Sequence, residues 1–225
     1  RHNGVDCIQF ECVSSREFSL DHRVDVIIHE QIGDFLFEEN MVENVVDLRD
    51  RLLKPGGRIL PNRFELFIEP VTLRDEFRIP FTWEHANLCG LDFRFVKEQM
   101  RDKLDGDYYF RTHGTYEVER FLCTPEPVLE LDLETVKTRQ LPRRLRYRRE
   151  VQQDGRLDGF ALYFRAIFDD RISLSNSPRE RNTSWANRLL RVEARRLVAG
   201  RSIEFEIHLR DLSNPATWRW HASPC

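Results

Sequence analysis

The change in hydrophobic periodicity at Pro61 places the strongest constraint on the fold. Before Pro61, a nearly continuous apolar run covers residues 24–28, and apolar residues recur at helical spacing over residues 41–53. After Pro61, apolar and polar residues alternate with a period of two, first over residues 64–69. The sequence therefore predicts an α/β segment followed by an all-β segment, with the boundary at Pro61.

The first segment, residues 1–61, predicts a parallel crossover. Residues 24–28 are rich in β-branched side chains, as expected of a strand covered on both faces. The helix predicted at 41–53 is stopped by the KPGG sequence at 54–57, and residues 58–60 form the next strand. Residues 7–10 are predicted as a further short strand. This arrangement is typical of the second half of a nucleotide-binding α/β domain.

The second segment, residues 62–225, predicts several antiparallel strands. Besides 64–69, the alternation recurs at 128–133, 160–168 and 203–209, which suggests a half-exposed sandwich or barrel. A different stretch lies between them, at about residues 88–123, and its part at 93–100 is predicted to be helical. The pattern alone allows two interpretations of this stretch, a helix packed on its own barrel or an arm that projects from it.

Two carboxylates, Glu30 and Glu39, stand at the ends of the EQIGDFLFEE sequence, directly after the first predicted strand. The carboxyl ends of strands in open α/β sheets are where ligands bind. Two carboxylates directed at one point suit a planar cation with several donors, and a guanidinium fits best. We therefore predict an arginine-binding loop with Glu30 and Glu39 as catalytic residues. The alternative is that Glu38 and Glu39 are acids that favour a helix N-terminus.

Four stretches of the sequence together resemble the protein arginine N-methyltransferase family. The stretch at 28–41 resembles the double-glutamate loop of that family, and the LKPGGRILPNR stretch at 53–63 resembles the strand and proline crossing that follow it. The LSNSP and NTSW stretches at 174–178 and 182–185 resemble its substrate-side Thr-His-Trp segment. The resemblance implies the C-terminal half of a Rossmann-like class I methyltransferase domain, followed by a β-barrel domain with a helical dimerisation arm.

The resemblance also implies an activity, the transfer of a methyl group from S-adenosylmethionine to a guanidino nitrogen of arginine in protein substrates. We expect arginine-rich protein substrates and a homodimer formed through the arm at residues 88–123. Orientation of the two reactants lowers such a barrier by several kcal/mol, about 7 in good cases, and fixed negative charge stabilises the developing cation. The alternative function is a catalytically inactive, methyltransferase-like regulatory subunit that dimerises with an active partner.

The resemblance assigns four substrate-binding residues. Met41 falls where the family has a methionine in the arginine pocket, and Thr183, Ser184 and Trp185 fall on the Thr-His-Trp segment. Ser184 replaces the histidine of the family, and a serine hydroxyl forms hydrogen bonds but carries no charge. Each assignment has a structural alternative, because a core-facing helix also accepts Met41 and a barrel core also accepts Trp185.

The residues expected to hold the cofactor are mostly not found in this sequence. The glycine-rich S-adenosylmethionine loop of the family, and the acidic residue that binds the ribose, have no match, and we expect them upstream of Arg1. Near residue 13, where the family contacts adenine with an acidic side chain, the sequence offers Ser14 and Ser15 instead. The 225 residues alone are therefore expected to bind S-adenosylmethionine poorly.

Composition excludes several other classes of function. The net charge is −3, and no apolar run reaches the length of a membrane span, so we expect no membrane partner. The five cysteines and seven histidines show no metal-ligand spacing, and reduced thiols suit the cytoplasm or nucleus. The basic stretch at 139–149 predicts a strand with a solvated cationic face, and contact with nucleic acid is the less favoured alternative.

Overall fold

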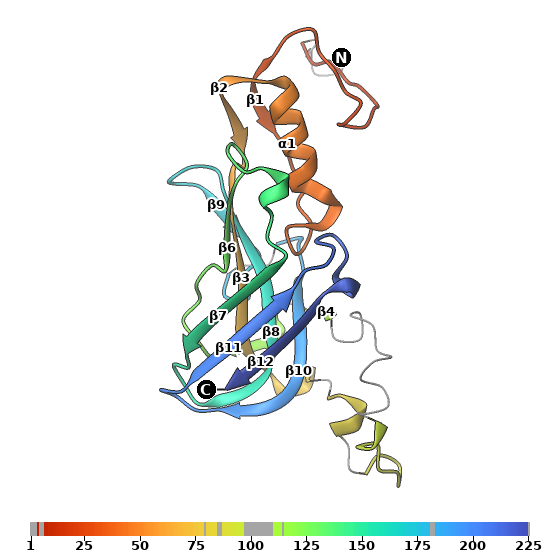
Figure 1. Ribbon diagram of the computed structural model, residues 1–225, viewed down its shortest axis with the longest axis vertical. Helices are drawn as coiled ribbons and strands as arrows, with labels where there is room; N and C mark the ends of the chain where they lie inside the picture. Colours follow the sequence, from red (N-terminus) through yellow and green to blue (C-terminus); the bar gives the residue numbers. More distant parts are fainter. Residues whose placement is uncertain are drawn as a thin grey trace.

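The computed structural model describes residues 4, 7–78, 80–84, 87–96, 110–113, 115–180 and 183–224. Over these residues the molecule is elongated, with a small α/β unit at one end and a larger β body, residues 62–224, below it (Figure 1). Within the described ranges, no helix combines the length and apolarity needed to cross a membrane.

The α/β unit consists of strand β1 (Val24–Ile28), helix α1 (Met41–Leu52) and strand β2 (Leu53–Leu60). The two strands pair in parallel, which confirms the predicted strand–helix–strand order. Strand β2 begins where α1 ends, so the KPGG sequence lies inside the strand and not in a separate loop. A shift of register between Val24 and Val26 accommodates these extra residues.

One face of β1 is open, contrary to the prediction that the strand is covered on both faces. Ile27 packs against the core, whereas Val26 is 44% and Ile28 77% exposed. Residues 7–10, predicted as a strand, have no strand structure, and Phe10 is 87% exposed. A strand needs a neighbour to satisfy its backbone groups, and this segment has none among the described residues.

The β body contains two antiparallel sheets. The larger sheet has the order β4-β10-β8-β3-β5, with β6 also paired to β3 and β9 to β8, and the smaller has the order β12-β11-β7. The strands of the larger sheet are β3 (Arg63–Leu73), β4 (Phe110–His113), β5 (Val118–Phe121), β6 (Leu129–Asp132), β8 (Gly155–Ile167), β9 (Ser173–Ser175) and β10 (Asn187–Leu197). Those of the smaller sheet are β7 (Arg144–Glu150), β11 (Ser202–His208) and β12 (Arg219–Pro224). The four alternating stretches of the sequence correspond to β3, β6, β8 and β11, so their assignment as antiparallel strands is confirmed.

Strand β3 is buried on both faces, which corrects the prediction that it is half-exposed. Phe64 and Leu66 belong to the main core, whereas Phe67 and Val71 belong to a second, smaller apolar cluster. Even Glu69, which the alternation placed on a solvated face, has no exposed surface. The reason is that both faces are covered, since the side chains of one face pack in the main core and those of the other in the second cluster, while Arg149 of β7 pairs with Glu69.

The main apolar core extends across Pro61. It includes Met41 and Val45 of α1 and Phe160 of β8. Phe35, in the segment between β1 and α1, meets the ring of Trp218 edge-on, with 5.3 Å between the centroids. The β1–α1 segment is therefore packed between the α/β unit and the β body.

Part of the predicted arm projects from the β body. Residues 88–96 of this arm, and residues 74–78 and 80–84 that lead toward it from β3, lie outside both sheets, in the lower right of Figure 1. Three of their apolar side chains are well exposed, Leu88 at 40%, Leu91 at 60% and Phe95 at 65%. Residues 97–109 lie outside the described residues, and so does most of the predicted helix at 93–100. Strands β4 and β5, from the end of the same segment, pair within the larger sheet.

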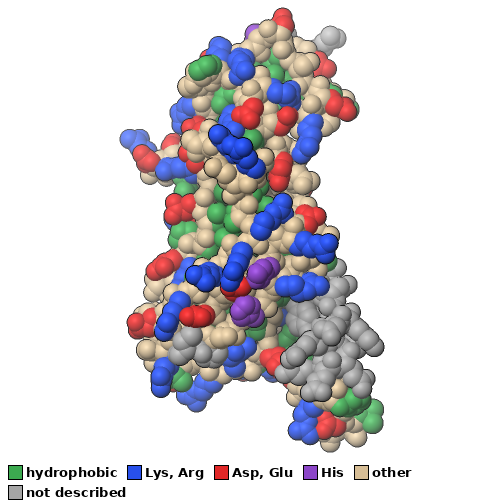
Figure 2. Space-filling view, in the orientation of Figure 1, with side chains coloured by type: hydrophobic (Ala, Val, Ile, Leu, Met, Phe, Trp, Pro, Cys, Tyr) green, Lys and Arg blue, Asp and Glu red, His purple; other side chains and the backbone are tan. Residues whose placement is uncertain are grey.

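The second half of the basic stretch lies in β7, and two of its exposed cations pair with acidic side chains. Arg144, Arg146 and Arg148 are exposed on the smaller sheet. Arg144 forms an ion pair with Glu206 on the neighbouring strand β11, and Arg148 lies 3.8 Å from Glu204. Basic and acidic side chains are interspersed over the face of the molecule in Figure 2. These pairs favour the interpretation of a solvated face over that of a nucleic-acid surface.

Candidate functional site

The segment between β1 and α1, residues 30–39, is here called the glutamate loop. Its backbone is unusual, because Leu36, Glu39 and the following Asn40 have φ angles of 73°, 62° and 54°. Such left-handed conformations are rare for residues other than glycine. Glu38 and Glu39 lie in the short 3-10 helix η1 (Glu38–Asn40), which directly precedes α1, although the φ of 62° at Glu39 is not helical. The position of both acids agrees with the alternative that they favour a helix N-terminus, but that alternative does not account for the left-handed backbone at Glu39.

The side chains of Glu30 and Glu39 are both exposed. Neither forms a hydrogen bond or an ion pair with any other described residue, so the expected partly desolvated notch is instead open to solvent. The two ends of the loop nevertheless meet at Asn44 of α1. Its Nδ2 donates to the side chain of Gln31 and to the carbonyl oxygen of Glu39, both at 3.1 Å. Two carboxylates near these ends are therefore available to an external cation.

Ser14 and Ser15, the predicted cofactor-side residues, lie in a turn beside the same helix. The Ser14 carbonyl oxygen accepts hydrogen bonds that close the turn, and the Ser15 carbonyl accepts one from Arg51 Nη2 at 2.8 Å. Arg16 Nε donates to Asn44 Oδ1 at 2.8 Å. Asn44 thus connects this turn to the glutamate loop, and the structure brings the two predicted groups into one neighbourhood.

Trp185 joins the substrate-side segment to the glutamate loop. Its indole Nε1 donates to the carbonyl oxygen of Ile32, and its ring meets Phe164 edge-on, with 5.6 Å between the centroids. Thr183 Oγ1 accepts a hydrogen bond from the Trp185 backbone at 3.3 Å. Ser184 is exposed and has no hydrogen-bond partner among the described residues. Trp185 and Thr183 therefore have structural partners at the site, whereas Ser184 has none.

Met41 follows the loop directly but is completely buried in the main core. This burial agrees with the structural alternative for Met41, a side chain that fills the core. No group of three or more His, Cys, Asp or Glu side chains in the described ranges is arranged to hold a metal ion.

Two polar side chains and one backbone N–H group of the β body hold the loop, and the sequence did not assign a role to any of these three residues. Asn176, which is fully buried, donates from Nδ2 to the Asp34 carbonyl oxygen at 3.2 Å. The backbone N–H of Ala186 donates to Asp34 Oδ1 at 3.0 Å, and Arg188 lies 2.9 Å from Asp34 Oδ2. Asn176, Ala186 and Arg188 show no diagnostic spacing, and they are 142 to 154 positions from Asp34, so no local pattern could have found these contacts.

His29 precedes Glu30 and points toward the crossing at Pro61. Its Nε2 lies 2.9 Å from the Pro61 carbonyl oxygen, which can only accept, so Nε2 carries the proton. The other ring nitrogen, Nδ1, is buried without a partner among the described residues. Burial lowers the pKa of His29 below its ordinary value, although the bond to Pro61 opposes this shift. His29 is thus a neutral anchor of the strand end.

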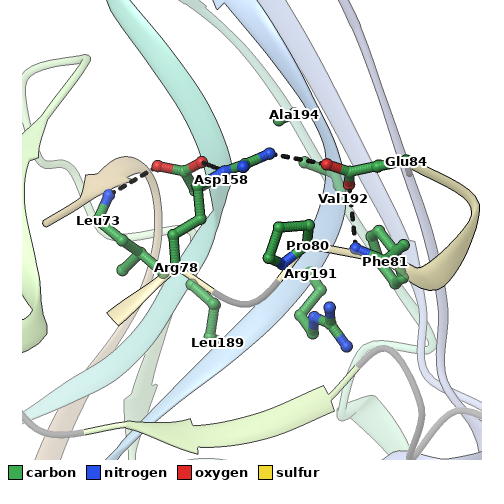
Figure 3. Close-up of a pocket in the computed structure, with 10 residues that line it drawn as sticks. All are labelled: Leu73, Arg78, Pro80, Phe81, Glu84, Asp158, Leu189, Arg191, Val192 and Ala194. Carbon is green, nitrogen blue, oxygen red and sulfur yellow. Dashed lines mark hydrogen bonds and ion pairs between the residues drawn. The ribbon is translucent and has the colours of Figure 1, made fainter. Parts of the chain in front are cut away.

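A separate polar pocket lies where the predicted arm leaves the β body. Arg78 bridges Asp158 at 3.2 Å and Glu84 at 2.7 Å, and Asp158 also accepts from the backbone N–H of Leu73 (Figure 3). The cavity has a volume of about 20 Å³, which is room for about one water molecule. The pocket therefore fixes the root of the arm and is too small for a substrate.

Comparison with known proteins identifies a family match over most of the chain. Residues 62–217 match the family model described as the arginine methyltransferase oligomerization subdomain. The chain is 33% identical over 183 residues to protein arginine N-methyltransferase 6 of Xenopus tropicalis, which covers 76% of this chain and 51% of that protein. It is 32% identical over 162 residues to the probable protein arginine N-methyltransferase 6 of Arabidopsis thaliana, which covers 70% of this chain and 35% of that protein.

A solved structure shares the fold. It is described as the Trypanosoma brucei PRMT1 enzyme–prozyme heterotetrameric complex with AdoHcy, and it superposes with a TM-score of 0.69 at 23% identity. The match covers 87% of this chain and 61% of that chain. The chain spans between about a third and a half of the length of the curated relatives above.

Proposed function

Because the chain belongs to the protein arginine N-methyltransferase family, we propose that the protein transfers a methyl group from S-adenosylmethionine to arginine in protein substrates. The observation that carries this proposal is the glutamate loop, which presents two exposed carboxylates without partners among the described residues. The substrate class that suits them is arginine-rich protein segments.

Glu30 and Glu39 would act on the substrate guanidinium. This group is a poor nucleophile because its lone pairs are delocalised and it stays protonated. Charge-assisted hydrogen bonds from two carboxylates orient the guanidinium and favour attack by one terminal nitrogen. Their fixed charge also stabilises the cation while the new bond forms. The proton released afterwards goes to a carboxylate or to water.

S-adenosylmethionine, when bound, supplies an electrophilic methyl group on a positively charged sulfonium. The exposed carboxylates of the glutamate loop suit a positively charged guest, and the turn with Ser14 and Ser15 lies beside the loop. The sequence has no glycine-rich loop of the family kind, so the described residues fit only part of this cofactor.

We also propose the finer architecture and assembly. Here β1, α1 and β2 are the C-terminal half of a Rossmann-like methyltransferase domain, and the β body is a barrel. The protein would form a homodimer through the arm at residues 88–123. Supporting observations are the match to an oligomerization subdomain and the exposed apolar side chains of Leu88, Leu91 and Phe95. We place this dimer in the cytoplasm or nucleus.

A second candidate function is a regulatory subunit without activity of its own. Ser184 stands where the family has a histidine, and it makes no hydrogen bond among the described residues. One relative of similar fold is described as an enzyme–prozyme complex. The exposed pair Glu30 and Glu39 favours the enzyme, because a scaffold has no need of two free carboxylates at this place.

The deciding experiment is transfer of labelled methyl from S-adenosylmethionine to an Arg-Gly-rich peptide by the full-length gene product. Glu30→Gln and Glu39→Gln should each reduce turnover by about 100-fold or more, as loss of a fixed electrostatic contact does. The matched control is Glu43→Gln, which removes a carboxylate from the first turn of α1.

The two candidate functions predict different results. Transfer that disappears in both loop variants but persists in the Glu43→Gln control supports the enzyme. Full turnover by Glu30→Gln would refute the role of the loop. A folded full-length protein that transfers no methyl group would favour the regulatory subunit, and its partner would then be sought among active methyltransferases.

A further inference from the structure

We propose that Arg188 is a positioning residue that holds the glutamate loop against the β body. It acts through an ion-pair cluster of Asp34, Glu38 and Arg188, here called the loop clasp. This inference rests on the proposed function, because it concerns the placement of Glu39 for catalysis. Arg188 is assigned a positioning role because it would act on Glu39 through its contacts with Asp34 and Glu38.

The clasp joins two distant parts of the chain through one guanidinium. Arg188 lies on β10, and its Nη2 is 2.9 Å from Asp34 Oδ2 and 3.4 Å from Glu38 Oε1. The side chains are 20%, 22% and 34% exposed for Arg188, Asp34 and Glu38. Because the cluster is partly buried, salt and water screen it less than they would a surface pair.

The two acids of the clasp also shape the loop itself. Glu38 Oε2 accepts a hydrogen bond from the backbone N–H of Asp34 at 2.9 Å, so the side chain folds back over the loop. It passes so close to Gly33 that a Cβ at that position would lie 2.0 Å from the Cβ of Glu38. The loop therefore requires both a glycine at 33 and a neutralising cation beside its two carboxylates.

The loop needs support from outside because its backbone is strained. Leu36, Glu39 and Asn40 hold left-handed φ angles, which persist only where the surroundings fix them. Asn44 supports the Glu39 carbonyl, but it belongs to α1, which continues directly from the loop. The contact of Arg188 with Glu38 comes instead from the β body, and it reaches the residue adjacent to Glu39.

Removal of the guanidinium should release this end of the loop. Asp34 and Glu38 would then be two like charges held together without a counter-ion, and their repulsion favours an open loop. Misplacement of a catalytic group by about 1 Å is enough to reduce turnover by about 100-fold. Lysine at 188 keeps the charge but replaces the planar guanidinium, whose Nη2 contacts both carboxylates, with an ammonium on a flexible stem.

The test compares four forms of the full-length protein: wild type, Arg188→Met, Arg188→Lys and the control Arg196→Met. Arg196 lies on the same strand, is 77% exposed and pairs with Asp154 at 3.1 Å, far along the strand from the clasp. The measurements are kcat and KM for an Arg-Gly-rich peptide, the Kd of S-adenosylmethionine, and amide hydrogen exchange of residues 31–40.

We expect Arg188→Met to lower kcat by about 10-fold to 100-fold and to speed amide exchange in the loop, with the Kd of S-adenosylmethionine unchanged. Arg188→Lys should fall between this variant and the wild type. Arg196→Met should match the wild type in every measurement. A merely structural role would lower the melting temperature and the active fraction without changing kcat per folded molecule.

Other results would overturn the inference. A wild-type kcat in Arg188→Met would refute it, even if amide exchange in the loop became faster. Unchanged amide exchange in the loop of this variant would refute it as well. If the wild type transfers no methyl group, the proposed function fails, and the exchange measurement alone still decides whether the clasp exists. If Arg188→Met does not fold, the same measurements on Arg188→Lys and Glu38→Gln test the clasp. If amide exchange in the loop and kcat are unchanged in both of these variants, the clasp is refuted.

Discussion

The substitution Arg149→Met should destabilise the β body strongly, because it removes one partner of a buried ion pair. Arg149 on β7 donates from Nη1 to both carboxylate oxygens of Glu69 on β3, at 2.7 and 2.8 Å. Glu69 has no exposed surface, and the Arg149 side chain is 8% exposed. The pair joins the smaller sheet to the larger one.

The magnitude follows from the burial of the carboxylate that would remain. Loss of one partner from a buried pair costs about 3–5 kcal/mol, because the other charge is left without compensation. For a chain of this size each kcal/mol lowers the melting temperature by about 2–4 °C, so we expect a decrease of roughly 6–20 °C. The guanidinium also stacks on the Tyr147 ring, 4.2 Å from its centroid, and this contact would be lost as well.

The loss should depend on pH in a defined direction. Burial raises the pKa of Glu69 to about 7, and the Arg149 guanidinium opposes that rise. Without Arg149 the pKa of Glu69 should increase further. Between the ordinary Glu pKa of about 4.5 and this raised value, Glu69 is protonated in the folded variant but ionised in the unfolded chain. The stability of the folded variant that depends on this proton is therefore fully present below pH 4.5. It is lost as the pH rises from 4.5 through the raised pKa of Glu69. The variant should be closer to the wild type at pH 5 than at pH 8.

Urea unfolding at pH 5 and pH 8 would test this reasoning. The control is Arg148→Met, which removes the exposed neighbour of Arg149 on the same strand and should change the free energy of unfolding by less than about 1 kcal/mol. The double variant Glu69→Leu/Arg149→Met should recover most of the loss, because no buried charge remains. A loss below about 1 kcal/mol at pH 8 in Arg149→Met would refute the argument, and so would a double variant no more stable than the single one.

Three further outcomes are expected. Gly33→Ala should lower methyl transfer with little loss of S-adenosylmethionine binding, because the new Cβ would lie 2.0 Å from the Cβ of Glu38 and force the loop to move. Initial rates would measure the transfer, and calorimetric titration would measure the binding. Phe35→Ala should cost about 3–5 kcal/mol in the free energy of unfolding, measured in urea, because the ring is buried against Trp218. Burial lowers the pKa of His29 in the folded state, so its contribution to stability should be complete above about pH 6.5 and decrease as the pH falls toward the lowered pKa. Melting curves recorded across this pH range should show no such decrease for a His29→Gln variant.

The glutamate loop is an example of what a local sequence pattern can predict. Glu30 and Glu39 could be chosen from the sequence because a loop with two carboxylates directly after a strand end is a local signal. The same holds for the strand–helix–strand order and for the alternation in β3, β6, β8 and β11. Each of these patterns lies within a few to a few tens of consecutive residues. Hydrophobic periodicity is therefore sufficient to predict the strands and the helix, and the residue types at the strand end are sufficient to choose the two carboxylates.

Strand β3 shows where the pattern fails. Glu65 and Glu69 are the same residue type, four positions apart, and alternation assigns both to a solvated face. Glu65 pairs with Arg165 near the surface, whereas Glu69 is fully buried against Arg149. The difference arises because the smaller sheet carries Arg149 over the second half of β3, and a single strand holds no information about the sheet that will cover it.

The sequence by itself thus determined the order of the elements, the location of the glutamate loop and its two candidate catalytic carboxylates. Tertiary structure alone decided what holds that loop in place. Arg188 and Glu38 are 150 positions apart, and Arg188 meets the loop only because β10 pairs beside β8 and the apolar loop residues dock on the same core. An ion pair of this kind depends on strand register and packing, which no spacing along the chain encodes.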